Sequence, residues 1–137
     1  MYYFGDRSRR NLDSCDVRLV HLLEECIEHF DFSVIEGHRT TGRQRILFNE
    51  GKSTLDGIEK KSKHQSFPSL AVDVMPYPAA LHGVSVWDDM VRWALFIGKI
   101  QGIATQMNIN IRCGIDWNND GSAKDHRFVD APHIELV

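Results

Sequence analysis

The chain has few cysteines, and they form no recognisable pattern. Cys15, Cys26 and Cys113 are the only three in 137 residues, and no two are spaced as C-x-x-C. An odd number without that spacing argues against a disulfide framework and against a cysteine-ligated zinc site. Cys26 falls among apolar residues at helical spacing, which predicts a small, buried hydrophobic side chain.

The sequence also lacks an excess of positive charge and any long apolar run. Its 16 Lys and Arg residues are outnumbered by 19 Asp and Glu residues, which gives a net charge of -3. A mildly acidic chain has no electrostatic reason to take nucleic acid or anionic lipid as its main partner. No apolar stretch approaches the ~20 residues that cross a bilayer. With 42% hydrophobic residues, the composition is that of a folded chain.

The first ten residues, MYYFGDRSRR, do not have the order of a secretory signal. Such a signal places basic residues before an apolar stretch, whereas here the aromatic residues come first. We therefore expect the protein to be made in, and at first kept in, a reducing cytoplasm. The length predicts one domain over residues 1–137, because no repeat or long linker divides the chain. We also expect a monomer.

The spacing of apolar residues and of helix-breaking residues predicts a mixture of helices and strands. The predicted helices cover residues 16–30, 41–49 and 85–107, and the predicted strands cover 32–36, 70–75, 109–113 and 133–137. Long loops are predicted over 52–68 and 114–132. This order indicates an α+β fold, in which a small antiparallel sheet packs against helices.

Three side chains could form a metal site. His64, Asp73 and His133 offer two nitrogen ligands and one oxygen ligand, and catalytic zinc takes three such ligands. Their combined charge of -1 leaves a zinc ion net positive, which would acidify a bound water. Asp73 lies in the apolar stretch LAVDVM, where an unpaired carboxylate costs several kcal/mol. A metal ion, a salt bridge or an exposed sheet edge must therefore compensate its charge.

Hydrolysis at such a site also needs a base and a group that stabilises negative charge. Asp130 precedes His133 by three residues, and a bend between them would bring its carboxylate to the attacking water. Glu135 is the competing base, although the period of two along a strand favours a supporting contact with His133. Arg39 follows a predicted strand and a glycine, where a guanidinium could hold a developing oxyanion. A surface position or an ordinary salt bridge is the alternative for Arg39.

A second metal site is possible in the segment 116–122. Asp116, Asn118 and Asp120 provide oxygen donors at alternate positions and are followed by Gly121, as at the start of an EF-hand loop. The glutamate expected at position 12 of that loop would fall at Arg127, which does not fit. The segment is therefore either a calcium site, with Asp125 near it, or an Asx-rich turn without metal.

Four short motifs together resemble a known peptidase family. Two of them are Gly37-His38-Arg39-Thr40, with Gln44, Leu47 and Gly51, and Ser62-Lys63-His64. The other two are Ala71-Val72-Asp73-Val74 and Asp130-Ala131-Pro132-His133-Ile134-Glu135. Their order and separation are similar to those of the D-alanyl-D-alanine carboxypeptidase and dipeptidase group of zinc peptidases. Small single-domain members of this group include phage endolysins that are L-alanyl-D-glutamate endopeptidases.

The resemblance implies a function and a role for each motif residue. It implies the DD-peptidase-like fold, with zinc held by His64, Asp73 and His133, Asp130 as acid and base, and Arg39 at the oxyanion. The expected substrate is the peptide stem of bacterial peptidoglycan, cut at the L-Ala–D-Glu bond by an endolysin that stays in the host cytoplasm until lysis. Cleavage of D-Ala–D-Ala is one alternative, and a non-catalytic, metal-binding module that recognises the wall is another.

The chain departs from the family pattern at two points. Eight residues separate His64 from Asp73, two more than is usual in the family, and the extra residues fall around Phe67-Pro68. If the longer loop moved His64 out of the metal site, His82 or His126 could take its place as a ligand. Asp130 stands where many relatives carry the longer glutamate.

Overall fold

The computed structural model describes residues 1–122 and 130–137 and confirms an α+β fold. The helices are α1 (Asp6–Asp13), α2 (Val17–Ile27), α3 (Thr41–Asn49) and α4 (Met90–Gln106), with 3₁₀ turns at Lys63–Gln65 and Val86–Asp88. The strands are β1 (Phe32–Glu36), β2 (Ala71–Pro76), β3 (Ala80–Leu81), β4 (Val84–Ser85), β5 (Ile111–Cys113) and β6 (His133–Leu136). Among these residues, no helix is both long enough and apolar enough to cross a bilayer.

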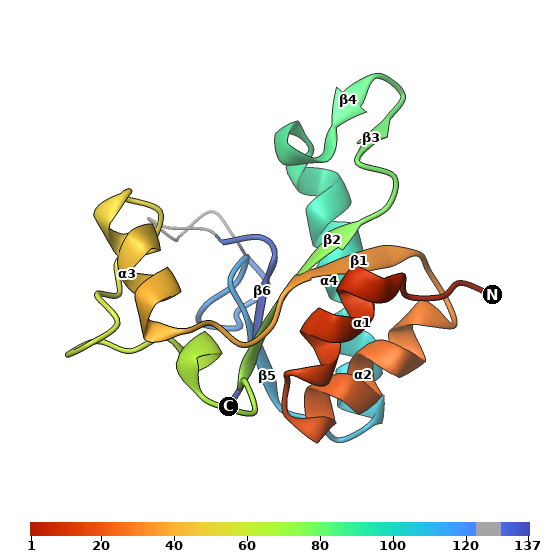
Figure 1. Ribbon diagram of the computed structural model, residues 1–137. Helices are drawn as coiled ribbons and strands as arrows, with labels where there is room; N and C mark the ends of the chain where they lie inside the picture. The colour runs from red at the N-terminus through yellow and green to blue at the C-terminus, as the bar shows by residue number, and fades with distance from the viewer. Residues whose placement is uncertain (123–129) are drawn as a thin grey trace.

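A four-stranded antiparallel sheet forms the centre of the molecule, in the order β1-β2-β6-β5. Helices α1, α2 and α4 gather on one side of it, and α3 lies on the other (Figure 1). Side chains of successive strand residues point to opposite faces, so Val72, Val74 and Ile134 enter the core under the three helices. Asp73 and His133 are register partners on adjacent strands, and alternation turns both to the opposite face, towards α3.

The two long core helices follow from their caps and apolar spacing. The Asp16 carboxylate accepts a hydrogen bond from the backbone N–H of Arg18 and begins α2. Five side chains of α2 are buried, namely Leu19, Leu22, Leu23, Cys26 and Ile27. Burial of a leucine or isoleucine side chain stabilises the fold by about 1.5–3 kcal/mol. The Asp89 carboxylate caps α4 in the same way, through the N–H of Arg92.

A β-bulge in β1 changes which side chain faces the site. Phe32 and Val34 are buried in the core, and strict alternation would send Glu36 there too. The register of β1 against β2 shifts between Val34 and Glu36, so that Glu36 pairs with Asp73. The extra residue, Ile35, therefore turns Glu36 onto the face that carries Asp73.

The structure also contains elements that the sequence pattern did not predict. Helix α1 is largely polar, and only Ser8 and Leu12 of it are buried. It packs closely on the chain after β1, where a Cβ on Gly37 would collide with the Asn11 carbonyl and the Ser14 hydroxyl. A turn at Lys63–Gln65 interrupts the predicted loop 52–68. The long helix begins at Met90 rather than at residue 85, because β4 and a 3₁₀ turn occupy 84–88.

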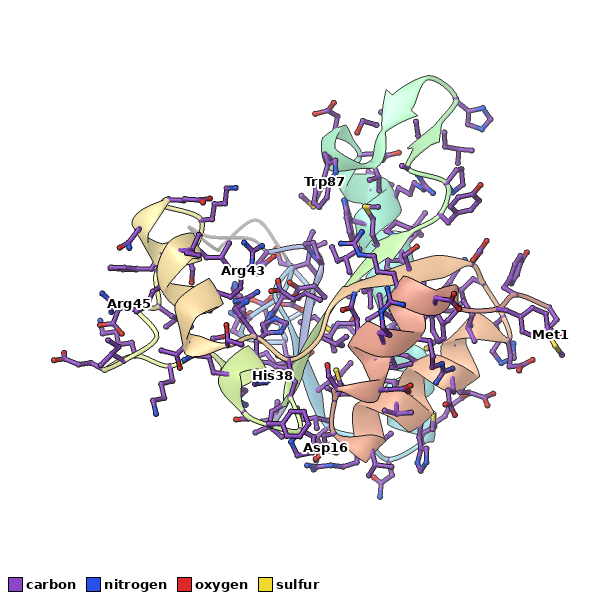
Figure 2. The ribbon with its side chains drawn as sticks, viewed as in Figure 1. Met1, Asp16, His38, Arg43, Arg45 and Trp87 are labelled. Atoms are coloured by element: carbon purple, nitrogen blue, oxygen red, sulfur yellow. The ribbon has the colours of Figure 1, made fainter. Side chains whose placement is uncertain are left out.

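All three cysteines are free and buried, which confirms the absence of a disulfide framework. The two short strands β3 and β4 form a hairpin that projects from the sheet beside the start of α4 (Figure 1). Trp87 lies at the base of this arm (Figure 2). Arg43 and Arg45 lie on opposite sides of α3, with Arg43 on the side that faces the sheet (Figure 2). The Arg43 Nε is 3.8 Å from Glu36 Oε1.

Candidate functional site

The structure brings His64, Asp73 and His133 together on the face of the sheet that is turned towards α3. The Nε2 atom of His64 is 3.1 Å from Asp73 Oδ1, and the Nδ1 atom of His133 is 3.4 Å from the same oxygen. One ligand atom from each side chain lies within 4.8 Å of the other two. Across residues 1–122 and 130–137, this is the one group of three or more His, Cys, Asp or Glu side chains close enough to share a metal ion.

Each imidazole is held by the ring nitrogen that faces away from Asp73. His64 Nδ1 is 2.8 Å from the carbonyl oxygen of Gly37, and His133 Nε2 is 2.8 Å from Glu135 Oε1. Because both outer nitrogens contact acceptors, they would keep their protons if a metal ion displaced the protons shared between the imidazoles and Asp73, and the inner nitrogens would then be the ligands. Glu135 thus makes the supporting contact with His133 that the sequence favoured.

The site favours positive charge. Burial alone would raise the pKa of Asp73, but hydrogen bonds with His133 and His64 hold it well below its usual range. Burial alone would lower the pKa of His133, but contacts with Asp73 and Glu135 raise it to about 9. Glu135 is buried, which would raise its pKa, yet its contacts with His133 and Arg112 lower that pKa to about 2. Two ionised carboxylates around two histidines provide the charge that a bound cation requires.

Arg39 is fixed in place by three hydrogen bonds. Its Nε and Nη2 atoms donate to the two carboxylate oxygens of Glu36, at 2.9 and 2.7 Å, and Nη1 donates to Gln44 Oε1 at 2.7 Å. Nη2 also lies 3.7 Å from Asp73 Oδ2. The guanidinium is nearly buried and stands between two carboxylates that the β-bulge places side by side. Arg39 is therefore not a surface arginine. It forms a salt bridge with Glu36, as the alternative expected, and this bridge holds its charge beside the candidate metal ligands.

Asp130 is half-buried and lines the same cavity as the three candidate ligands. Its carbonyl oxygen accepts a hydrogen bond from the backbone N–H of His133, which closes the predicted bend between them. Burial raises the pKa of Asp130, and the neighbouring charge of Asp73 raises it further. A half-buried carboxyl group with a raised pKa beside these histidines is a candidate for proton exchange.

The cavity has a volume of about 660 Å³ and reaches from the sheet to the loop after α3. Its basic residues are Arg39, Lys52, Lys61, Lys63 and Arg112. Two residues in its wall had no assigned role from sequence. Arg112 donates to Glu135 Oε2 at 2.8 Å, and the Trp117 ring lies 5.3 Å from the His133 ring, centroid to centroid. Glu36 was also missed, because its position in the strand pattern pointed to the core.

The structure tests one of the two alternative histidine ligands, and it does not decide whether the turn at 116–122 binds calcium. His82 lies exposed in the turn of the β3–β4 hairpin and does not line the cavity, so the proposal that it replaces His64 is wrong. His126 and Asp125 lie outside the described residues. The Asp116 carboxylate accepts hydrogen bonds from the N–H groups of Asp120 and Gly121, and Asn118 donates to Asp120. These contacts close the turn, and calcium binding there stays a prediction.

Comparison with known proteins points to one family. The family model described as phage L-alanyl-D-glutamate peptidase matches residues 1–137. The L-alanyl-D-glutamate peptidase of Escherichia phage T5 is 27% identical over 141 residues, which cover 99% of this chain and 98% of that protein. The crystal structure of Serratia marcescens L-Ala D-Glu endopeptidase ChiX superposes with a TM-score of 0.72 at 27% identity. That match covers 98% of this chain and 90% of ChiX.

Proposed function

Because this chain belongs to the phage L-alanyl-D-glutamate peptidase family, we propose that it hydrolyses the L-Ala–D-Glu bond of peptidoglycan stem peptides with a zinc ion held by His64, Asp73 and His133. One observation carries the proposal. These three side chains come from a 3₁₀ turn and two adjacent strands, and they meet in one cavity with Asp130 and Arg39. The arrangement contains a candidate metal site, a proton-exchanging carboxyl group and a fixed cation.

The donor set fits zinc in number, chemistry and orientation. Two imidazole nitrogens and one carboxylate oxygen are a common ligand set for catalytic zinc, which leaves a further position for water. The contacts of the outer ring nitrogens with Gly37 and Glu135 keep the inner nitrogens available. When bound, zinc supplies Lewis-acid polarisation of the scissile carbonyl and lowers the pKa of a coordinated water.

The chain's own residues then handle the proton and the developing charge. Asp130 takes a proton from the attacking water and delivers it to the amine that leaves, for which its raised pKa is suited. Arg39 presents its charge where the carbonyl oxygen becomes negative. Glu36 and Gln44 hold the guanidinium, so it does not need to reorganise during the reaction.

The rim of the cavity suits an anionic peptide. Lys52 and Lys61 are exposed residues of the loop after α3, and both line the opening. A stem peptide carries the free carboxylate of D-Glu beside the scissile bond. The lysine side chains can reach such a carboxylate while their charged ends remain in water.

Peptidoglycan digestion tests the proposal directly. Mass spectrometry of muropeptides from purified walls should show stem peptides with a new N-terminal D-Glu. Released D-Ala would instead support the D-Ala–D-Ala alternative, and an unchanged wall that still binds the protein would support the non-catalytic module. Asp130→Asn should lose activity but keep stoichiometric zinc, whereas His133→Ala should lose both. Asp88→Asn, at an exposed acid on the η2 turn (Val86–Asp88), is the matched control. Zinc content near zero in the active wild-type protein would overturn the metal assignment.

We place this activity in host-cell lysis, with the enzyme acting on the wall as a monomer after its release from the cytoplasm. Calcium at the Asp116, Asn118 and Asp120 turn is a further proposal, because that turn precedes the segment that leads to Asp130. Lytic activity measured with added calcium, and with a chelator too weak to remove zinc, decides it. An unchanged rate in both conditions contradicts a regulatory calcium site.

A further inference from the structure

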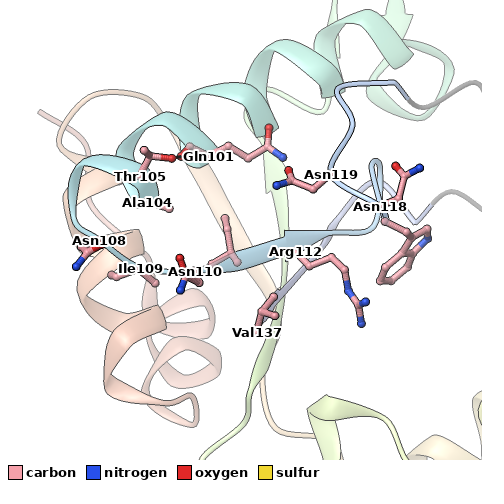
Figure 3. A pocket seen from close by; sticks show the side chains of 12 residues that line it. Gln101, Ala104, Thr105, Asn108, Ile109, Asn110, Arg112, Asn118, Asn119 and Val137 are labelled. Carbon is pink, nitrogen blue, oxygen red and sulfur yellow. Dashed lines mark hydrogen bonds between the residues drawn. The ribbon is translucent and has the colours of Figure 1, made fainter.

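A second groove, with a volume of about 490 Å³, runs along the outer edge of the sheet (Figure 3) and shares two lining residues with the cavity described above. Its walls are the C-terminal part of α4, the edge strand β5 and the turn after β5 (Figure 3). Five of its lining residues carry a carboxamide side chain, namely Gln101, Asn108, Asn110, Asn118 and Asn119. Gln101 extends from α4 towards Asn119 on the opposite wall (Figure 3).

The lining of this groove differs in charge from that of the catalytic cavity. Arg112 is the one charged side chain that the groove shows among the described residues, and it stands at the border with the cavity. A carboxamide both donates and accepts hydrogen bonds, as do the hydroxyl and N-acetyl groups of amino sugars. Ala104, Ile109, Ile111 and Val137 provide apolar surface between the amides. Such a neutral lining suits an uncharged polar ligand better than an anionic peptide.

Two residues join the groove to the candidate catalytic site. Arg112 and Trp117 line both the groove and the cavity. The Arg112 guanidinium lies 5.7 Å from the centre of the Trp117 ring, and that ring contacts the ring of His133. A ligand in the groove is therefore separated from a candidate metal ligand by one side chain.

We propose that this groove holds the N-acetylated glycan strand to which the stem peptide is attached. The inference rests on the proposed function, because it uses the position of the scissile bond. L-Ala is the first residue of the stem and is joined to the lactyl group of N-acetylmuramic acid. A peptidase that cuts after L-Ala must accommodate the sugar within about one residue of the scissile carbonyl, and an extended residue spans about 3.5 Å. The groove adjoins the cavity through Arg112 and Trp117, and apart from Arg112 its lining side chains are uncharged.

An added peptide strand is the competing occupant, since β5 is the edge of the sheet. However, β5 has only three residues, and the carboxamides that dominate the groove come from α4 and the turns on either side of β5. A peptide on β5 would be recognised mainly by the backbone and would gain little from them. The lining therefore favours a glycan.

The test compares one stem peptide with and without its sugar. The two substrates are the free tetrapeptide and the same tetrapeptide on N-acetylglucosaminyl-N-acetylmuramic acid. The wild-type enzyme should prefer the glycan-bearing form, and the preference is the ratio of the two kcat/KM values. Gln101→Ala and Asn110→Ala should each lower this ratio about three- to tenfold, the expected effect of one lost hydrogen bond. Gln106→Ala removes an exposed carboxamide of α4 outside the groove and should leave the ratio unchanged.

A binding measurement separates this inference from the proposed function. The peptide-free disaccharide is titrated into the zinc-loaded Asp130→Asn protein, and the side-chain amide signals of Gln101 and Asn110 are followed by NMR. Saturable shifts of these signals support the glycan site even if no peptide bond is cut. Absence of shifts, or a substrate ratio that neither groove variant changes, overturns it. If the enzyme cuts both substrates equally well, the proposed function stands and the glycan site is wrong.

Discussion

Replacing Gln44 by alanine removes a buried link between the candidate catalytic arginine and the loop that follows α3. The Gln44 side chain accepts a hydrogen bond from Arg39 Nη1 at 2.7 Å. It donates to Ser53 Oγ at 2.9 Å and to the carbonyl oxygen of Leu55 at 2.8 Å. Gln44 is fully buried, so water cannot take over these contacts without rearrangement of the loop.

The expected destabilisation follows from these three contacts. A neutral hydrogen bond contributes about 1 kcal/mol and one to a charged group about 1.5–3 kcal/mol. The free energy of unfolding of Gln44→Ala should therefore fall by about 3–5 kcal/mol, with a decrease in Tm of about 10–17 °C. Urea unfolding followed by circular dichroism measures the first quantity, and a thermal scan measures the second. The exposed Gln106→Ala variant should unfold like the wild type, within about 0.5 kcal/mol.

A second substitution separates stability from the placement of Arg39. Gln44→Glu can still accept from Arg39, but it directs a carboxylate at the Leu55 carbonyl oxygen and loses that hydrogen bond. It should lose about 2 kcal/mol of stability while it keeps a kcat close to the wild-type value. Gln44→Ala should lower kcat about tenfold or more, because Arg39 retains only Glu36 as a strong partner. A loss of stability below about 1 kcal/mol in Gln44→Ala would refute the assignment of this residue as a structural link.

Four further perturbations test other parts of the structure. Gly37→Ala should lower the free energy of unfolding by about 2–3 kcal/mol in urea titrations, because its Cβ would meet the backbone of α1 and the Ser14 hydroxyl. In the same assay, Gly98→Ala, on the exposed face of α4, should raise it by up to about 1 kcal/mol. Glu135→Gln should weaken zinc binding about 10- to 100-fold in a competition titration, since Glu135 orients His133; an unchanged affinity would contradict that role. Burial raises the pKa of all three thiols to about 12, from an ordinary value near 9, so iodoacetamide at pH 8 should label them only in urea. Rapid labelling of the native protein would contradict the burial of the thiols. The stability that the protonated thiols contribute to the fold is complete below pH 9 and is lost as the pH rises through about 12.

The parts of the site that could be predicted are those with a local signal. Asp73 interrupts an apolar strand, and burial of an unpaired carboxylate there is too costly to be incidental. His133 and Glu135 are two residues apart on a strand, which places them on one face without further knowledge. The bounds of α3 and β1 matched their predictions because a helix cap or a glycine marks their ends. His64 had no such local signal, and it was a candidate only as part of a set of two histidines and an aspartate that could hold a metal ion.

The parts that could not be predicted depend on contacts between distant segments. Glu36 shares its strand parity with Phe32 and Val34, and only the bulge, formed against β2, turns it towards Arg39. Helix α1 has too few apolar residues for their spacing to predict it, and its Ser8 hydroxyl accepts a hydrogen bond from the Val34 N–H of β1. Arg112 and Trp117 acquire their roles because β5 lies beside β6. Each of these features requires the sheet order, which periodicity in a single sequence does not provide.

The candidate metal ligands lie on paired strands, whereas the groove residues lie at the edge of the sheet, and this difference affects how such an enzyme can change. Asp73 and His133 are register partners, and a slip of one residue in either strand would turn the side chain of that strand into the core, so the candidate metal site tolerates little variation. The groove carboxamides stand at a helix end and in turns, where single substitutions leave the sheet intact. On the proposed glycan site, single substitutions in the groove would therefore change how the glycan is bound without rebuilding the candidate metal site.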